Sequence, residues 1–165
     1  MRLFDTSVIG QSERFKGVYS DRKAWHRPDL DVIIRRARSF GVRAIIFSTG
    51  YIADVEVSLA NCYRFKNTYT TIGVSAPRSM DPYQNFDLKL GRSKTKFEHK
   101  KELKLLKENV ILMDSLLDRK FALETYFKRM DKILENDYYS KRKIVAVGVC
   151  GLDFSRKFIP KQLQI

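Results

Sequence analysis

The sequence predicts an α/β fold built on a parallel sheet. Short apolar runs alternate along the chain with segments whose apolar residues recur at helical spacing, and this alternation is typical of βα units. The runs are apolar at consecutive positions, as in strands that are covered on both faces. Because 165 residues is the length of one ordinary domain, we expect a single domain over residues 1–165.

The pattern places four strands, at residues 3–9, 42–47, 68–74 and 144–149. A loop through Pro28 precedes a first helix, which starts at Asp29 and ends at Gly41. The apolar face of that helix is formed by Leu30, Ile33, Ile34 and Ala37. Residues 54–63 are predicted to form a second helix between the second and third strands.

Residues 81–143 separate the third and fourth strands, where one crossover helix would suffice. An apolar stripe predicts a helix at about 99–118, and its members are Leu103, Leu106, Val110, Met113 and Leu117. A second helix, from residue 118 or 119 to about 136, is the better candidate for the crossover. Its stripe is Leu123, Phe127, Met130 and Leu134. We therefore expect a helical insertion at about 81–118.

The net charge of +13 predicts a polyanionic partner, and the 44% hydrophobic content excludes a disordered basic tail. Residues 89–107 carry a net +6 of that charge, with eight basic side chains against Glu98 and Glu102. The alternative is that these lysines only solubilise an exposed helix. The candidate nucleic-acid-binding residues are Lys89, Arg92, Lys94, Lys96, Lys100, Lys101, Lys104, Lys107, Arg35, Arg36, Arg38, Lys141, Arg142, Lys143, Arg156, Lys157 and Lys161.

Two cysteines, Cys62 and Cys150, exclude a disulfide framework, and we expect both to be reduced, packed thiols in a reducing compartment. No apolar run approaches the ~20 residues that span a bilayer, so we expect no membrane partner. A cytoplasmic location is the default, with mitochondrial and nuclear locations left open.

Residues 145–154 read V-A-V-G-V-C-G-L-D-F and resemble the TatD family of metal-dependent deoxyribonucleases. Further matching segments are Phe4-Asp5, residues 15–19, His26 with Asp29-Leu30, Thr49-Gly50 and residues 71–74. The resemblance covers most of residues 3–80 and 119–160 and omits the basic insertion. It implies half of a (β/α)8 barrel, so the expected fold class is a truncated, TIM-barrel-like half-barrel with parallel strands.

The resemblance also implies metal ligands that this sequence lacks. The family's ligand glutamate on the fourth strand corresponds to Val149, the histidine after the third strand to Ser75, and a polar position on the first strand to Ile9. The family's remaining ligands belong to strands five to eight, beyond Ile165. We expect the retained Asp5 and Asp153 to make loop or cap hydrogen bonds, and His26 and His99 to be structural or to face phosphate. We therefore expect no catalytic residue, no metal site and no cofactor.

Half a barrel leaves an inner face, with Val145, Val147 and Val149, uncovered. We expect the stripe of the insertion to cover it, or else a second copy or a larger assembly. The functional hypothesis is a non-catalytic protein that binds structured RNA, as a structural, stabilising or dormancy (hibernation) factor. Its expected partners are rRNA within a ribosome and neighbouring ribosomal proteins. The alternatives are a metal-dependent nuclease, residual or completed by a partner subunit, and a protein-interaction subunit.

Overall fold

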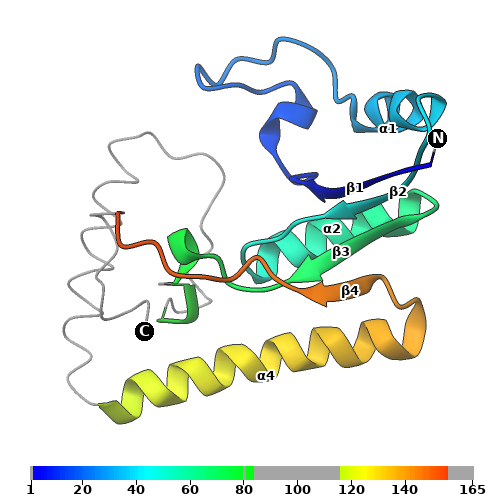
Figure 1. The fold of residues 1–165 in the computed structure, drawn as a ribbon. Helices are drawn as coiled ribbons and strands as arrows, with labels where there is room; N and C mark the ends of the chain where they lie inside the picture. The colour runs from blue at the N-terminus through cyan, green and yellow to red at the C-terminus, as the bar shows by residue number, and fades with distance from the viewer. Residues whose placement is uncertain (1, 80, 84–115, 156–165) are drawn as a thin grey trace.

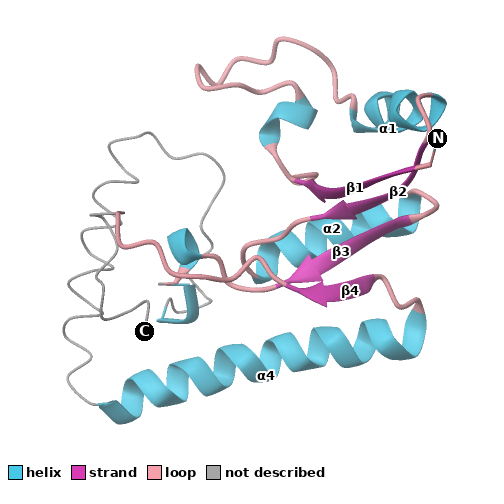
Figure 2. Ribbon diagram, viewed as in Figure 1, coloured by secondary structure: helices cyan, strands magenta, loops and turns pink. Residues whose placement is uncertain are grey.

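The computed structural model describes residues 2–79, 81–83 and 116–155, with the side chains of α4 described from residue 120 onward. Its centre is a sheet of four parallel strands in the order β1-β2-β3-β4. The strands are β1 (Leu3–Val8), β2 (Val42–Phe47), β3 (Thr68–Ile72) and β4 (Ile144–Val147). The predicted α/β fold with an open, barrel-like half-sheet is therefore confirmed (Figure 2). The predicted helix at 99–118 lies almost wholly outside the described residues.

In the described part of the chain, three helices lie between the strands: α1 (Leu30–Ser39), α2 (Ile52–Arg64) and α4 (Leu116–Ser140). The loops carry the 3-10 turns η1 (Glu13–Lys16), η2 (Ala76–Arg78) and η3 (Asp81–Tyr83). Gly41 follows α1 with a φ of 95° and donates its amide to the Arg38 carbonyl. Only glycine adopts this φ without steric cost, which explains why the first helix stops where the sequence predicts.

Two apolar clusters hold the helices against one face of the sheet. Ile34 of α1 packs with Ile45 and Phe47 of β2 and with Cys62 of α2. A second cluster joins Ile52 and Val55 of α2 to Ile72 of β3 and to Tyr126 and Met130 of α4. Because α2 contributes to both clusters, it is the helix that ties the two halves of the core together.

The buried stripe of α4 differs from the predicted one by one residue. Tyr126 is fully buried, whereas Phe127, which the helical spacing placed in the stripe, is 50% exposed. The Tyr126 hydroxyl donates to Asp81 Oδ2 at 3.0 Å and accepts the Ile52 amide at 3.3 Å. These partners from η3 and α2 satisfy the hydroxyl inside the core, so an aromatic residue with a polar end is the better anchor.

The opposite face of the sheet carries exposed valines of β4. Val145 is 49% exposed, Val147 is 77% exposed, and Val149, just beyond the strand, is 47% exposed. The sequence predicted that these side chains point to the inner side of a half-barrel. Of the proposed cover, the stripe at 103–117, only Leu117 in the first turn of α4 falls within the described residues, and its side chain is not described.

The buried carboxyl group of Asp81 makes stability depend on pH. Burial raises the pKa of Asp81, and the hydrogen bond from Tyr126 and the charge of Arg78 offset only part of this effect. The folded protein therefore holds this proton to a higher pH than the unfolded chain does, so the free energy of unfolding falls as pH rises above the unfolded pKa of about 3.9. Burial raises the pKa of Asp54 as well, and that group acts in the same direction.

We predict that Asp81→Asn removes the part of this pH-dependent fall in the free energy of unfolding that Asp81 causes. The unfolding midpoint of the variant, relative to wild type, should rise as the pH is raised from about 4 to 7, since wild type alone must ionise the buried carboxyl. Thermal unfolding followed by circular dichroism at several pH values measures the difference. A midpoint difference that stays constant across this range would contradict the prediction.

Candidate nucleic-acid interface

The carboxyl ends of the strands form the edge where (β/α)8-barrel enzymes place their catalytic residues. Hydrogen bonds from backbone amides and from a threonine hydroxyl join neighbouring segments of the chain at this edge. The Ser75 amide donates to the Gly50 carbonyl at 2.9 Å, and the Val149 amide donates to the Thr49 carbonyl at 3.0 Å. The Thr49 hydroxyl donates to the Thr71 carbonyl at 2.7 Å. This edge is ordered by contacts between neighbouring strands.

The side chains at this edge do not fit a pair of divalent metal ions, which the TatD-like resemblance implies. Ile9, 60% exposed, and Val149 present carbon, and Ser75 presents one hydroxyl, where carboxylate or imidazole donors are needed. Within residues 2–79, 81–83 and 116–155, no three His, Cys, Asp or Glu side chains lie close enough together to hold a metal ion.

The retained acidic residues make local hydrogen bonds, as the sequence predicted. Asp5 Oδ1 accepts the Ser7 amide at 3.3 Å, and Asp153 Oδ1 accepts the Ser155 amide at 3.2 Å. One cysteine prediction is wrong, because Cys150 is exposed, whereas Cys62 is buried as expected. Cys150 follows β4 at the open edge of the sheet, where nothing described covers its thiol.

His26 is a structural residue of the loop between β1 and α1. Its Nε2 lies 3.1 Å from the Tyr19 hydroxyl, and its Nδ1 lies 2.7 Å from the Arg27 carbonyl oxygen. Nδ1 also lies 3.7 Å from a carboxylate oxygen of Asp29. Both ring nitrogens therefore have partners within one loop, which confirms the structural interpretation. His99 lies outside the described residues.

A polar cluster occupies the carboxyl edge beside α2. The Arg78 guanidinium lies 4.0 Å from the centre of the Tyr51 ring, and its charge also acts on Asp54. Burial raises the pKa of Tyr51, and Arg78 lowers it in part. The cluster places the carboxyl groups of Asp54 and Asp81 near the single guanidinium of Arg78, so it is a packing unit of η2, η3 and α2 that carries no excess positive charge.

The amino ends of the strands present a different surface. In a parallel sheet every helix returns the chain to the same edge, and Figure 1 shows the ends of α1, α2 and α4 there. We call this surface the amino edge. Its basic side chains are Arg36, Arg38, Arg43, Arg64, Lys66, Lys141, Arg142 and Lys143. All are exposed except Lys143, which is half-buried.

Five of the sequence-predicted binding residues belong to the amino edge, since they lie in the last turns of α1 or between α4 and β4, namely Arg36, Arg38, Lys141, Arg142 and Lys143. Arg35 forms an ion pair with Asp31 at 3.0 Å, which offsets its charge. The candidates at 89–107 and 156–161 lie outside the described residues. Arg43, Arg64 and Lys66 were not predicted from the sequence, because each stands apart from a basic run. The signal that would have found them is their position beside the start of a predicted parallel strand.

Three of these cations lie over aromatic rings. Lys141 Nζ lies 4.8 Å from the centre of the Tyr63 ring, the Arg142 guanidinium lies 4.8 Å from that of Tyr138, and Lys143 Nζ lies 5.2 Å from that of Tyr69. A ring orients a cation without neutralising its charge, as a carboxylate would. Lys143 Nζ also donates to the Thr68 carbonyl at 3.3 Å, so Lys141 and Arg142 are the two of these cations that remain available to an incoming anion.

Asp137 fixes the turn that carries Lys141 and Arg142. Its carbonyl accepts the amides of both residues, at 3.1 and 2.8 Å, and its Oδ2 accepts the Ile144 amide at 2.7 Å. Asp137 is 3% exposed, so its carboxylate is held inside the turn and does not compete at the surface for the cations. Arg142 adopts a φ of 51°, a conformation in which a helix end usually carries glycine.

None of the helices in the described part of the chain combines the length and apolar character needed to cross a membrane.

The fold is similar to that of a solved TatD hydrolase. The crystal structure of a hydrolase TatD family protein from Entamoeba histolytica superposes with a TM-score of 0.61 at 22% sequence identity. The match covers 99% of this chain and 42% of that chain, so this chain spans less than half the length of the hydrolase. No model of a known protein family matches the sequence. The comparison, together with the parallel β1-β2-β3-β4 sheet, shows that this chain has a TatD-like α/β fold.

Proposed function

We propose that this protein binds structured RNA through the amino edge and does not hydrolyse it. The observation that carries this proposal is the convergence of basic side chains from three helix ends and a strand on one edge of the sheet. Phosphates make the dominant contribution to protein–nucleic acid affinity, and a compact body with spread cations suits the shape-based recognition of folded RNA.

The composition of the carboxyl edge supports binding over catalysis. A metal-activated nuclease needs oxygen and imidazole ligands at that edge, and Ile9 and Val149 cannot coordinate a cation. The net charge of +13 is in turn more than a small enzyme needs for solubility. We infer a structural, stabilising or dormancy role on rRNA within a ribosome, in a reducing compartment such as the cytosol.

Equilibrium binding to a folded rRNA hairpin tests the proposal. We expect the affinity to fall linearly on a log–log plot against salt, with a slope of about 0.9 for each phosphate contacted on a duplex. A salt-independent affinity, or none at physiological salt, would reject RNA binding.

A cleavage assay tests the absence of hydrolysis. The purified protein is incubated with labelled RNA and DNA in Mg²⁺ or Mn²⁺, with and without a chelator. We expect no chelator-sensitive cleavage. Cleavage that disappears in an Asp5→Asn, Asp153→Asn double variant would show that the retained carboxylates still support a nuclease, and it would separate true activity from a contaminant.

Arg142 allows binding to be separated from stability. Because Arg142 has positive φ, Arg142→Gly relieves backbone strain and should leave the free energy of unfolding unchanged or raise it by about 1 kcal/mol. The same change removes one cation, so the salt slope of RNA binding should fall by about one. Urea titration and binding isotherms measure the two effects. An unaltered RNA affinity would show that Arg142 does not contact phosphate.

A further inference from the structure

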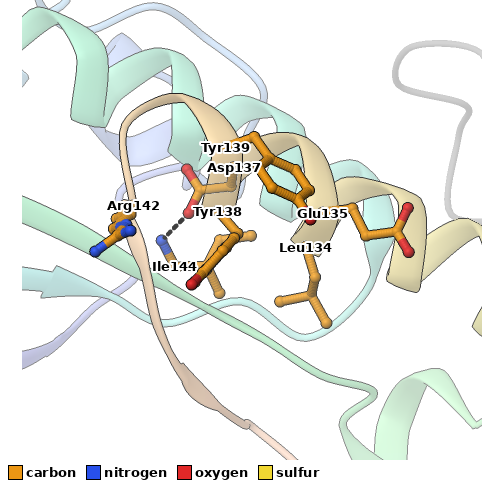
Figure 3. A pocket seen from close by; sticks show the side chains of 7 residues that line it. All are labelled: Leu134, Glu135, Asp137, Tyr138, Tyr139, Arg142 and Ile144. Carbon is orange, nitrogen blue, oxygen red and sulfur yellow. Dashed lines mark hydrogen bonds between the residues drawn. The ribbon is translucent and has the colours of Figure 1, made fainter.

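A pocket of about 450 Å³ opens on the amino edge between the last turns of α4 and the start of β4 (Figure 3). Its apolar lining comes from Leu134 and Ile144, and its aromatic lining from Tyr138 and Tyr139. The Asp137 carboxylate accepts the Ile144 amide at 2.7 Å and so holds β4 against the helix end. The pocket is therefore built on hydrogen-bonded backbone and on a helix, rather than on a loop.

The two tyrosines differ in what their rings can still contact. Their ring centres lie 5.3 Å apart and their planes meet at 84°, so the rings meet edge to face. The Arg142 guanidinium already lies over the Tyr138 ring at 4.8 Å. Tyr139 is 85% exposed, which is unusual for so large a ring. Tyr139 is thus the ring with an open face for a flat ligand.

The two ends of the pocket carry exposed side chains of opposite charge. Figure 3 shows Arg142 at one end and Glu135 at the other, with the tyrosines between them. A phosphate is attracted to the guanidinium and to the neighbouring Lys141, and it is repelled by the Glu135 carboxylate. The second carboxylate of the lining, Asp137, lies on the Arg142 side, but it is buried and accepts the Ile144 amide, so the exposed charge at that end is positive. A nucleobase offers N–H donors that a carboxylate can accept, and its flat face stacks on tyrosine. A nucleotide satisfies both ends of the pocket, whereas an apolar peptide would leave both charges unused.

We infer that this pocket takes one unpaired nucleotide of RNA, with its base stacked on Tyr139 and its phosphate at Arg142. This inference deepens the proposed function and rests on it. The amino edge then has two parts: a row of cations that holds paired RNA by its phosphates, and a stacking site at the α4 end that selects an unpaired base. Loops and bulges of structured RNA present such bases.

The test compares two RNAs with the same number of phosphates, a hairpin with a single-stranded loop and a continuous duplex. The full-length chain should bind the hairpin more tightly. Tyr139→Ala should lower the hairpin affinity at least about fivefold and leave the duplex affinity unchanged, since stacking on an aromatic residue contributes about 1–3 kcal/mol per base. Tyr139→Phe keeps the ring and should restore the wild-type preference.

Phe121→Ala is the matched control, because Phe121 is a 72% exposed aromatic residue near the other end of α4. It should change neither affinity. If both RNAs bind but Tyr139→Ala changes them equally, or changes neither, the nucleotide pocket is overturned and the proposed function stands. If neither RNA binds at physiological salt, both are overturned. Displacement of the hairpin by an apolar peptide, but not by a nucleoside monophosphate, would assign the pocket to a protein partner instead.

Discussion

The triple variant Arg36→Glu, Arg43→Glu, Lys141→Glu should lose binding of structured RNA at physiological salt. The three residues come from α1, β2 and the turn after α4, so the variant places negative charge across the whole amino edge. Each lost phosphate contact lowers the salt slope by about one, so the slope should fall by about three. The affinity should fall by roughly two orders of magnitude, because repulsion is added to the lost contacts. Fluorescence anisotropy over a salt series measures both quantities.

A second triple variant controls for net charge. Arg14→Glu, Lys23→Glu, Lys128→Glu changes the total charge by the same amount at exposed positions of η1, the β1–α1 loop and the middle of α4. We expect it to retain most of the affinity, because these side chains lie away from the amino edge. Equal losses in the two triple variants would mean that overall charge, and not the amino edge, drives binding.

Tyr126→Ala should remove a large part of the free energy of unfolding. Tyr126 is fully buried in the cluster that joins α4 to α2 and β3, and removal of a buried aromatic side chain costs about 3–5 kcal/mol. The change also deprives the buried Asp81 carboxylate and the Ile52 amide of their shared partner. Since domains of this size are stable by only about 5–15 kcal/mol, the loss is a major part of the total. Urea denaturation followed by circular dichroism measures it.

Phe127, the next residue of α4, provides the control for Tyr126→Ala. Phe127→Ala removes an equally large ring that is 50% exposed, and it should cost much less than Tyr126→Ala. Tyr126→Phe keeps the ring and removes only the hydroxyl, so it should cost an intermediate amount, about 1–3 kcal/mol. Equal costs for Tyr126→Ala and Phe127→Ala would contradict the packing described for α4.

The strands were the most predictable part of the fold. Consecutive apolar residues, as at 44–47, are typical of a strand in a parallel sheet, and this pattern identifies the strand without tertiary information. The strand ends were less predictable, and β4 ends at Val147 instead of residue 149. The backbone at Gly148 has a φ of 151°, which the apolar character of the segment does not reveal.

Helical spacing alone does not show that Tyr126, and not Phe127, is the buried residue of α4. Both residues fit an apolar face, and hydrophobicity alone favours phenylalanine. The deciding partners, Asp81 and Ile52, lie 45 and 74 residues away in sequence. The hydrogen bonds that make a buried tyrosine favourable exist only after η3 and α2 have been placed beside α4.

The amino edge was predicted in part for a similar reason. The run at Lys141–Lys143 is visible in the sequence, but Arg43, Arg64 and Lys66 are separated by apolar and polar residues. They join that run only because parallel βα units bring every strand start to one edge. The exposed Tyr139 and the pocket beside it depend on the turn fixed by Asp137, which no local pattern identifies.

Photo-crosslinking of the protein to structured RNA, followed by peptide mapping, distinguishes binding at the amino edge from binding at the carboxyl edge. We expect crosslinks at Tyr138, Tyr139 and the cations of the α4–β4 turn, on RNA that stays intact in the presence of Mn²⁺. Crosslinks confined to the carboxyl ends of the strands, around Ile9, Ser75 and Val149, would contradict this expectation.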